Sequence, residues 1–364
     1  MSVPKPLDEP VALALDSIGL VADMADSVAA FDAARAGAEA VEIPWKPEAI
    51  RNVAICGMGG SAIAADLVAG AFRERLRVPV GVVRDYYLPG WISEDTLVIV
   101  SSYSGETEET LTACMQALER GSPSIGITSG GKLAGRYADE GIPIVPLPPG
   151  LQPRAAILRL LVPLVVMLDR MGVVASADAD LDEARETVAR SVAALGPDVP
   201  SETNGAKIFA HALLDTVPII WGAEATSPVA QRCKCQINEN AKAPAFWASL
   251  PELDHNEICG FEGMGDFGPL ARLVMLRDPR HHRQVGRRFE LTREIVEPTV
   301  GGVLEVTADG NSPLARVVDL LMLGDYMSLY LGLLRGVDPG PVEAIGRLKR
   351  GLAATGNGQA LGPA

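Results

Sequence analysis

The sequence predicts an α/β protein made of two αβα domains, each with a mostly parallel sheet flanked by helices. Short apolar runs alternate with segments of helical periodicity along most of the chain, which is typical of strand–helix repeats. The strand–turn–helix plan of 52–72 recurs after residue 217. A length of 364 residues also suits two domains, which we place at 1–175 and 176–364.

Five strands are expected in the first half of the chain, at 52–56, 78–83, 96–100, 124–128 and 142–147. Helical periodicity follows three of these runs, over 61–72, 106–118 and 132–138. Residues 7–38 predict a leading helix, which Gly19 is expected to interrupt. A long apolar helix is expected from Gln152 to about Gly172, with Pro153 in its first turn, where proline is tolerated.

Two turns rich in glycine and hydroxyl residues suggest a phosphate-binding cradle at the ends of two strands. Each turn leads into a helix, whose free N–H groups and dipole attract an anion. The glycines let the backbone approach the phosphate oxygens, and the hydroxyls donate to them. The cradle residues are Gly59, Gly60 and Ser61 in the first turn, and Ser102, Ser104 and Thr107 in the second.

A nucleotide is the first alternative ligand for these turns. Gly57-x-Gly59-Gly60 is a poor match to GxGxxG because Ala62 holds the last glycine position, and no GxxxxGK[ST] is present. A glycine-rich turn can also be purely structural, and a hydroxyl can simply cap a helix. The four small hydroxyl residues within 101–107 favour the phosphate.

The second half of the chain repeats this plan. Strands are expected at 217–221, 272–276 and 302–306, and helices at 181–195, 203–214, 282–294, 313–334 and 341–352. The turn over 222–227 takes the place of the first cradle turn, but it lacks the paired glycines and most of the hydroxyls. We therefore expect a complete phosphate cradle in the first domain only.

Composition excludes several classes of protein. The net charge of −14 argues against nucleic-acid binding and means that local donors must hold an anionic substrate. The apolar stretch 155–174 carries Arg159, Asp169 and Arg170, which indicates a buried helix rather than a membrane span. The first ten residues lack the layout of a signal peptide, so we expect a cytoplasmic protein. Five scattered cysteines and four histidines predict neither a disulfide framework nor a metal site.

Six motifs carry a resemblance to a known family. GMGGSAIAADL at 57–67 and SSYSGETEETL at 101–111 resemble the sugar isomerase (SIS) domain, which binds phosphosugars. The remaining motifs resemble the bifunctional phosphoglucose/phosphomannose isomerases of bacteria and archaea: GLQPRAAI at 150–157, QINENAKAPAF at 236–246, PELDHNEICGF at 251–261 and VEAIGRLK at 342–349. The resemblance covers 52–352, and the block 236–261 is its most specific part.

The resemblance implies two SIS-type domains and an aldose–ketose isomerase. Its substrates would be glucose 6-phosphate and mannose 6-phosphate, converted to fructose 6-phosphate through an enediol without metal or cofactor. The family's tolerance of both C2 epimers has been linked to a threonine near the C-terminal helix, and the segment 338–342 contains none. Activity on glucose 6-phosphate is therefore the firmer expectation.

The resemblance also assigns roles to four residues. Glu239 corresponds to the base, His255 to the histidine that opens the sugar ring, Arg154 to the arginine near the reacting carbons, and Lys349 to the lysine that holds the sugar. Residue type alone would make them a solvated glutamate, a capping histidine, a surface arginine and a solvated lysine. In the family the histidine enters from the partner subunit, which implies a homodimer with shared active sites.

Two other functions are alternatives to the isomerase. A non-catalytic phosphosugar-binding SIS regulator would place a DNA-binding module in front of the domain, whereas only about 50 residues precede the expected first strand, and this segment carries a net negative charge. An amide-transferring sugar-phosphate enzyme would carry a domain with an N-terminal nucleophilic cysteine, whereas this chain begins Met1-Ser2. Both comparisons favour the isomerase, with a phosphorylated hexose as substrate and neither nucleic acid nor membrane as partner.

Overall fold

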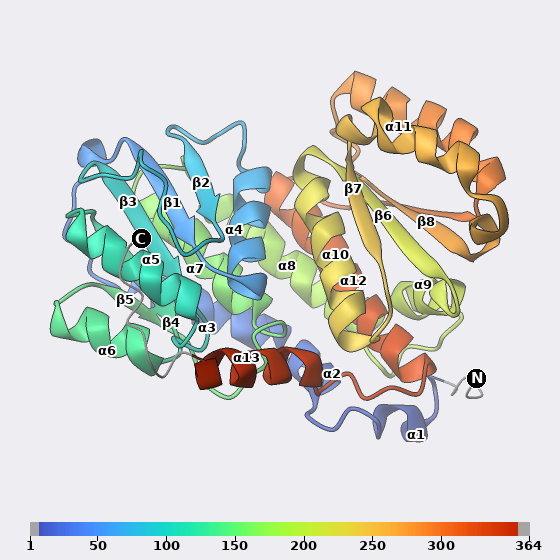
Figure 1. The fold of residues 1–364 in the computed structure, drawn as a ribbon, viewed down its shortest axis with the longest axis horizontal. Helices are drawn as coiled ribbons and strands as arrows, with labels where there is room; N and C mark the ends of the chain where they lie inside the picture. The colour runs from blue at the N-terminus through green and yellow to red at the C-terminus, as the bar shows by residue number, and fades with distance from the viewer. Residues whose placement is uncertain (1–6, 356–364) are drawn as a thin grey trace.

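A computed structural model describes residues 7–355 and contains two parallel sheets (Figure 1). The first sheet has five strands in the order β2-β1-β3-β4-β5, and the second has four in the order β7-β6-β8-β9. All strand pairs within them are parallel. The prediction of two αβα domains is confirmed, while the boundary placed between residues 175 and 176 stays a prediction.

The first sheet and its helices occupy the region expected from the sequence. Its strands are β1 (Asn52–Cys56), β2 (Val80–Val83), β3 (Thr96–Ser101), β4 (Ser124–Thr128) and β5 (Ile144–Pro146). Its helices are α3 (Ser27–Glu39), α4 (Gly59–Ala71), α5 (Glu108–Glu119), α6 (Gly131–Asp139) and α7 (Ile157–Arg170). Two short helices, α1 (Pro10–Leu13) and α2 (Leu20–Ala25), precede α3, and the left-handed φ of 74° at Gly19 gives the expected interruption.

Alternating side chains on β1 explain why this sheet is covered on both faces. Val53 and Ile55 belong to the large core cluster that α3, α4 and α7 also join. Ala54 and Cys56 face the opposite way and pack with side chains of α5 and α6. Because neighbouring residues of a strand point to opposite faces, a fully apolar strand requires a layer of helices on each side.

The second sheet is built in the same way. Its strands are β6 (Val217–Ala223), β7 (Phe246–Leu250), β8 (Ala271–Arg277) and β9 (Val303–Thr307). Its helices are α8 (Asp178–Leu195), α9 (Gly205–Leu213), α10 (Ser227–Asn240), α11 (Arg283–Val296) and α12 (Pro313–Leu334), with α13 (Glu343–Thr355) at the end of the described chain.

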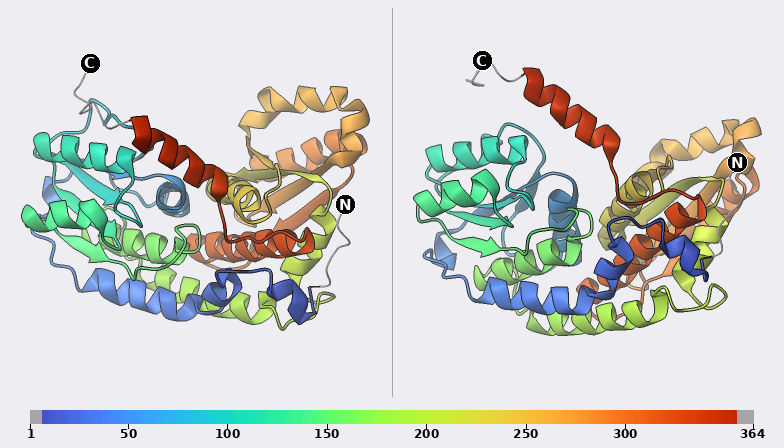
Figure 2. Two further views of the ribbon diagram at one scale, coloured as in Figure 1. Left: turned by 60° about the horizontal axis from the view of Figure 1, so that its bottom comes forward. Right: turned by 90° about the horizontal axis from the view of Figure 1, so that it is seen from below.

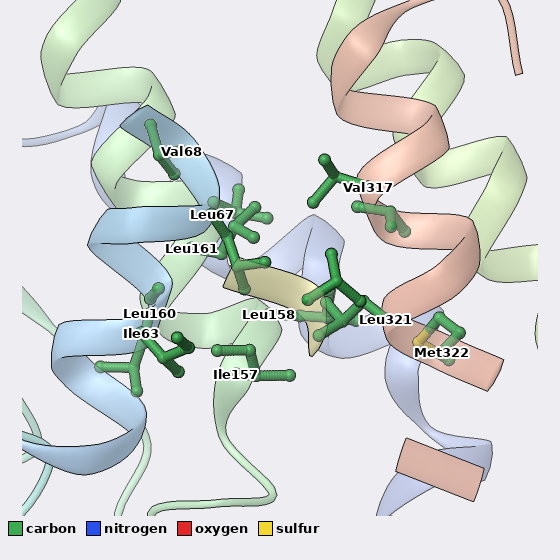
Figure 3. Packing of buried hydrophobic residues seen from close by; sticks show 14 of the residues in the cluster. Ile63, Leu67, Val68, Ile157, Leu158, Leu160, Leu161, Val317, Leu321 and Met322 are labelled. Atoms are coloured by element: carbon green, nitrogen blue, oxygen red, sulfur yellow. The ribbon is translucent and has the colours of Figure 1, made fainter. Parts of the chain in front are cut away.

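The two halves of the protein share one continuous apolar core. Leu67 of α4, Leu161 of α7 and Leu321 of α12 lie in the same buried cluster (Figure 3). Helix α12 also packs along α8, α9 and α10. Since protein interiors are densely packed, this shared core holds the first sheet at a fixed position relative to the second.

Two elements differ from the sequence expectations. The long helix begins at Ile157 rather than Gln152, because residues 152–156 form a turn in which the Ala155 N–H donates to the Gln152 carbonyl. Strand β7 was not predicted. It is a five-residue edge strand whose Phe246 is 59% exposed, so it lacks the pattern of a half-buried strand.

Within the described residues, one helix is long and apolar enough to cross a membrane. This helix is α12 rather than the stretch 155–174, and 89% of its apolar window is buried inside the protein. Such burial is typical of the central helix of a folded core.

Candidate functional site

The two cradle turns lie side by side, because β1 and β3 are paired and parallel and both turns follow their carboxyl ends. Gly59 has a φ of 51°, a left-handed value that favours glycine. A side chain at Gly60 would place its Cβ 2.9 Å from the carbonyl oxygen of Pro153. Gly60 therefore lets the turn that carries Arg154 approach the start of α4, where Ser61 is buried.

The second cradle turn is ordered by its own hydroxyls. The Ser102 hydroxyl donates to Thr107 Oγ1 at 3.0 Å and accepts from the Gly105 N–H at 3.1 Å. Ser104 is exposed, and its Oγ accepts from the Glu106 N–H at 3.3 Å. Thr107 is the N-cap residue of α5, and its side chain makes no capping hydrogen bond. Ser104 and Thr107 are therefore the two hydroxyls best placed to turn towards an incoming anion.

Arg154 is buried at the junction of the two halves, with 5% of its surface exposed. Its Nε–H donates to Asn240 Oδ1 at 2.8 Å, and its Nη2 donates to the carbonyl oxygens of Pro339 and Gly340 at 2.7 and 2.6 Å. Burial lowers the pKa of Arg154, and the nearby Glu239 carboxylate opposes this shift. Three hydrogen bonds therefore hold the guanidinium in one orientation.

Glu239 extends from the end of α10 towards this arginine. Its Oε2 lies 4.0 Å from Arg154 Nη1, and its side chain is 33% exposed. Glu239 and Lys242 line a cavity of about 450 Å³ with residues 341–345. The carboxylate can thus be reached by a small molecule while a cation lies beside it, which suits a base that forms an anionic intermediate.

Lys242 lies beside the site, and the sequence did not identify it as a candidate residue. Its ammonium group donates to the Glu239 carbonyl and, at 3.1 Å, to the Pro339 carbonyl. Burial lowers the pKa of Lys242, and the charge of Arg154 lowers it further. Lys242 and Asn240 both fall inside the motif at 236–246, so the only available signal was their proximity to Glu239 in the sequence.

His255 does not join this group within one chain. Helix α10 returns from the carboxyl end of β6 to the amino end of the parallel strand β7, so Glu239 lies near the amino end of that strand. His255 follows the carboxyl end of β7, in a short helix over Glu252–His255. Its side chain is exposed and makes no hydrogen bond or ion pair within residues 7–355.

Lys349 lies on α13, which stands away from both sheets (Figure 2). Its side chain is exposed, and no side-chain partner is seen for it in the described part of the chain. The start of the helix is nevertheless tied to the site, since Ile345 lines the same cavity as Glu239. Lys349 lies one helical turn beyond Ile345, about 6 Å along the helix axis.

No group of three or more His, Cys, Asp or Glu side chains is arranged to hold a metal ion among residues 7–355. The charged groups that converge on the site are instead Arg154, Glu239 and Lys242. This arrangement can accept a proton and stabilise an oxyanion.

Comparisons with known proteins show the family to which the chain belongs. Residues 49–192 match the SIS domain, and residues 202–352 match the bacterial phospho-glucose isomerase C-terminal SIS domain. A bifunctional phosphoglucose/phosphomannose isomerase of Caldicellulosiruptor bescii is 40% identical, over 86% of this chain and 93% of the relative. An Aquifex aeolicus protein with the same description is 36% identical, over 83% of this chain and 90% of the relative.

The chain belongs to the bifunctional phosphoglucose/phosphomannose isomerase family. The motif-based resemblance is therefore confirmed. Membership of this family supports an isomerase over a non-catalytic phosphosugar sensor. A glucose-6-phosphate isomerase-like protein from Thermus thermophilus has a similar fold, with a TM-score of 0.63 and 23% identity over 92% of this chain and 98% of that protein.

Proposed function

We propose that this protein interconverts glucose 6-phosphate, and also mannose 6-phosphate, with fructose 6-phosphate through an enediol. The observation that carries the proposal is the placement of Glu239 Oε2 4.0 Å from the buried Arg154 guanidinium, beside the turn that packs against Gly60 of the phosphate cradle. A base, a fixed cation and an anion-binding turn are three of the features that such an isomerisation requires, and a group that opens the sugar ring is the fourth.

The proposed reaction starts with the phosphate on the two cradle turns. Glu239 removes the proton from C2 of the open-chain aldose, and electrons shift to the C1 carbonyl oxygen to form the enediolate. Arg154 stabilises that negative charge through Nη1, the nitrogen closest to Glu239. The proton of the O2 hydroxyl passes to O1, Glu239 returns its proton to C1, and O2 becomes the carbonyl of the ketose. Lys349 would contact the sugar when α13 lies over the site.

The same proposal includes a homodimer in which His255 of a second copy opens the sugar ring. Its support is that His255 follows the carboxyl end of β7, whereas Glu239 of the same chain lies near the amino end of that strand. We also propose that the dimer acts in the cytoplasm and binds neither nucleic acid nor membranes. The net charge of −14 and the burial of α12 support this part.

A coupled assay with each aldose phosphate tests the proposal. We expect conversion of glucose 6-phosphate, and a loss of about 10²–10⁴-fold in kcat for Glu239→Gln with phosphosugar binding retained, because the amide keeps its shape but cannot accept the proton. Glu290→Gln on the exposed face of α11 is the matched control. A protein that binds hexose phosphates tightly but converts neither aldose would instead be a sensor.

A further inference from the structure

Several hydrogen bonds within the protein determine the orientation of the Arg154 guanidinium. Arginine has five N–H donors. Three of them are used by Asn240 Oδ1 and by the carbonyls of Pro339 and Gly340, all within 2.8 Å of their donors. Nη1 alone is directed to the site, with Gln152 Oε1 at 3.4 Å and Glu239 Oε2 at 4.0 Å. The guanidinium therefore presents one nitrogen to the position of the substrate.

Asn240 is the side chain that fixes the plane of this guanidinium. It is 1% exposed, accepts from Arg154 Nε, and donates through Nδ2 to Ser328 Oγ on α12 at 2.9 Å. The Ser328 hydroxyl in turn donates to the Asp325 carbonyl at 2.8 Å. The amide oxygen of Asn240 accepts a hydrogen bond and its amide nitrogen donates one, so the side chain has one defined orientation.

A buried ion pair between Arg232 and Asp325 links the same group of residues to the backbone of Arg154. Arg232 on α10 donates to both carboxylate oxygens of Asp325, at 2.9 and 2.7 Å, and each of these side chains is 3% exposed. Arg232 Nη2 also donates to the Arg154 carbonyl at 2.9 Å. The second half of the protein thus binds Arg154 by its side chain and by its backbone.

This connection crosses the junction between the phosphate cradle and the base. Arg154 lies in the turn that packs against Gly60 of the cradle, whereas Asn240 is the residue after Glu239. The surrounding core of α4, α7 and α12 is buried and continuous (Figure 3). A small change in the Arg154–Asn240 contact would therefore move the cation relative to the base.

We propose that Asn240 is a positioning residue for catalysis. Its hydrogen bond to Arg154, supported by Ser328 and by the Arg232–Asp325 pair, holds Nη1 where the enediolate charge develops. This inference rests on the proposed isomerase function. The Asn240 amide is 1% exposed and bonded within the protein at both its oxygen and its nitrogen, so its loss should affect the transition state much more than the ground state.

Two substrate-like ligands separate these effects in binding measurements. Sorbitol 6-phosphate carries the phosphate but no negative charge at C1 or C2, whereas 5-phosphoarabinonate carries a carboxylate that mimics the enediolate. For Asn240→Ala we expect kcat and the affinity for 5-phosphoarabinonate to fall by about 10–100-fold, the range for one hydrogen bond to a charged group. The affinity for sorbitol 6-phosphate should change by less than about threefold.

Two further variants make the test independent of how well Asn240→Ala folds. Asn240→Asp keeps an acceptor oxygen for Arg154 Nε, so it should recover part of the lost kcat. Ser328→Ala removes the partner that orients Asn240. It should lower kcat and the affinity for 5-phosphoarabinonate selectively, by a smaller factor than Asn240→Ala does. No recovery in Asn240→Asp, with no selective loss in Ser328→Ala, would overturn the proposal.

Asn204→Ala is the matched control. Asn204 is also fully buried, and it caps α9 with two accepted hydrogen bonds and one donated bond, outside the Arg154 connection. The Asn204→Ala variant should be less stable to unfolding, but its affinities for the two ligands should not change by different factors. An equal loss of both ligands in Asn240→Ala would make Asn240 merely structural. An inactive wild-type enzyme would refute the isomerase function instead, so the two failures are distinguishable.

Discussion

Mixed dimers of two inactive variants should recover isomerase activity. The perturbation is the combination of Glu239→Gln, which removes the proposed base, with His255→Ala, which removes the proposed ring-opening group. A homodimer of either variant is defective in both of its sites. In a mixed dimer with shared sites, one site receives Glu239 from one chain and His255 from the other and is intact.

The structure supplies the reason to expect this result. Strand β7 separates the two residues, and its five residues span about 16 Å at about 3.3 Å per residue. Two groups that act on one sugar must each lie within about 3 Å of it, or reach it through one water. With random pairing, about half of the dimers are mixed and one of their two sites is intact, so recovery should approach about a quarter of full activity.

The assay is co-expression, or refolding together, of the two variants followed by the coupled isomerase measurement. Differently tagged chains allow the mixed dimer to be isolated and quantified. Each variant prepared alone is the control for residual activity. Mixed dimers that form but remain inactive would refute the shared-site reasoning, because His255 would then serve its own chain.

Three further predictions concern binding, stability and metal dependence. Ser104→Ala combined with Thr107→Ala should weaken hexose phosphate binding by about 1.5–3 kcal/mol for each hydrogen bond lost to the phosphate, as measured by calorimetry; unchanged affinity would place the cradle elsewhere. Burial opposes ionisation of Glu183, but hydrogen bonds from Asn311 and Ser312 outweigh it and lower the Glu183 pKa. The stabilising effect of ionised Glu183 is therefore present above the unfolded pKa of about 4.3 and is lost as pH falls through the lower folded value. Glu183→Gln should make the free energy of unfolding, measured in urea, depend less on pH at acid pH. An unaltered pH profile would contradict the role of Glu183. Activity should survive a chelator, because in the proposed mechanism Arg154 rather than a metal stabilises the enediolate; loss in chelator with recovery on adding zinc would contradict this.

The strands and the cradle turns were predictable because their causes are local. An apolar run such as Val53–Cys56 followed by glycines and a helical period specifies strand, turn and helix within about 20 residues. Both cradle turns then meet at one edge because β1 and β3 are parallel neighbours. Strand β7 was not predicted because it is short, lies at an edge of the sheet and exposes Phe246. Its residues therefore lack the pattern of a half-buried strand.

The sequence by itself determined the fold class, the family and the identity of the candidate residues. The surroundings of those residues were decided by the tertiary structure alone. Arg154 meets Asn240 across 86 positions and the Pro339 carbonyl across 185, contacts that no local pattern encodes. The distant packing of α4, α7 and α12 brings these donors and acceptors together, and the course of β7 separates Glu239 from His255 of the same chain.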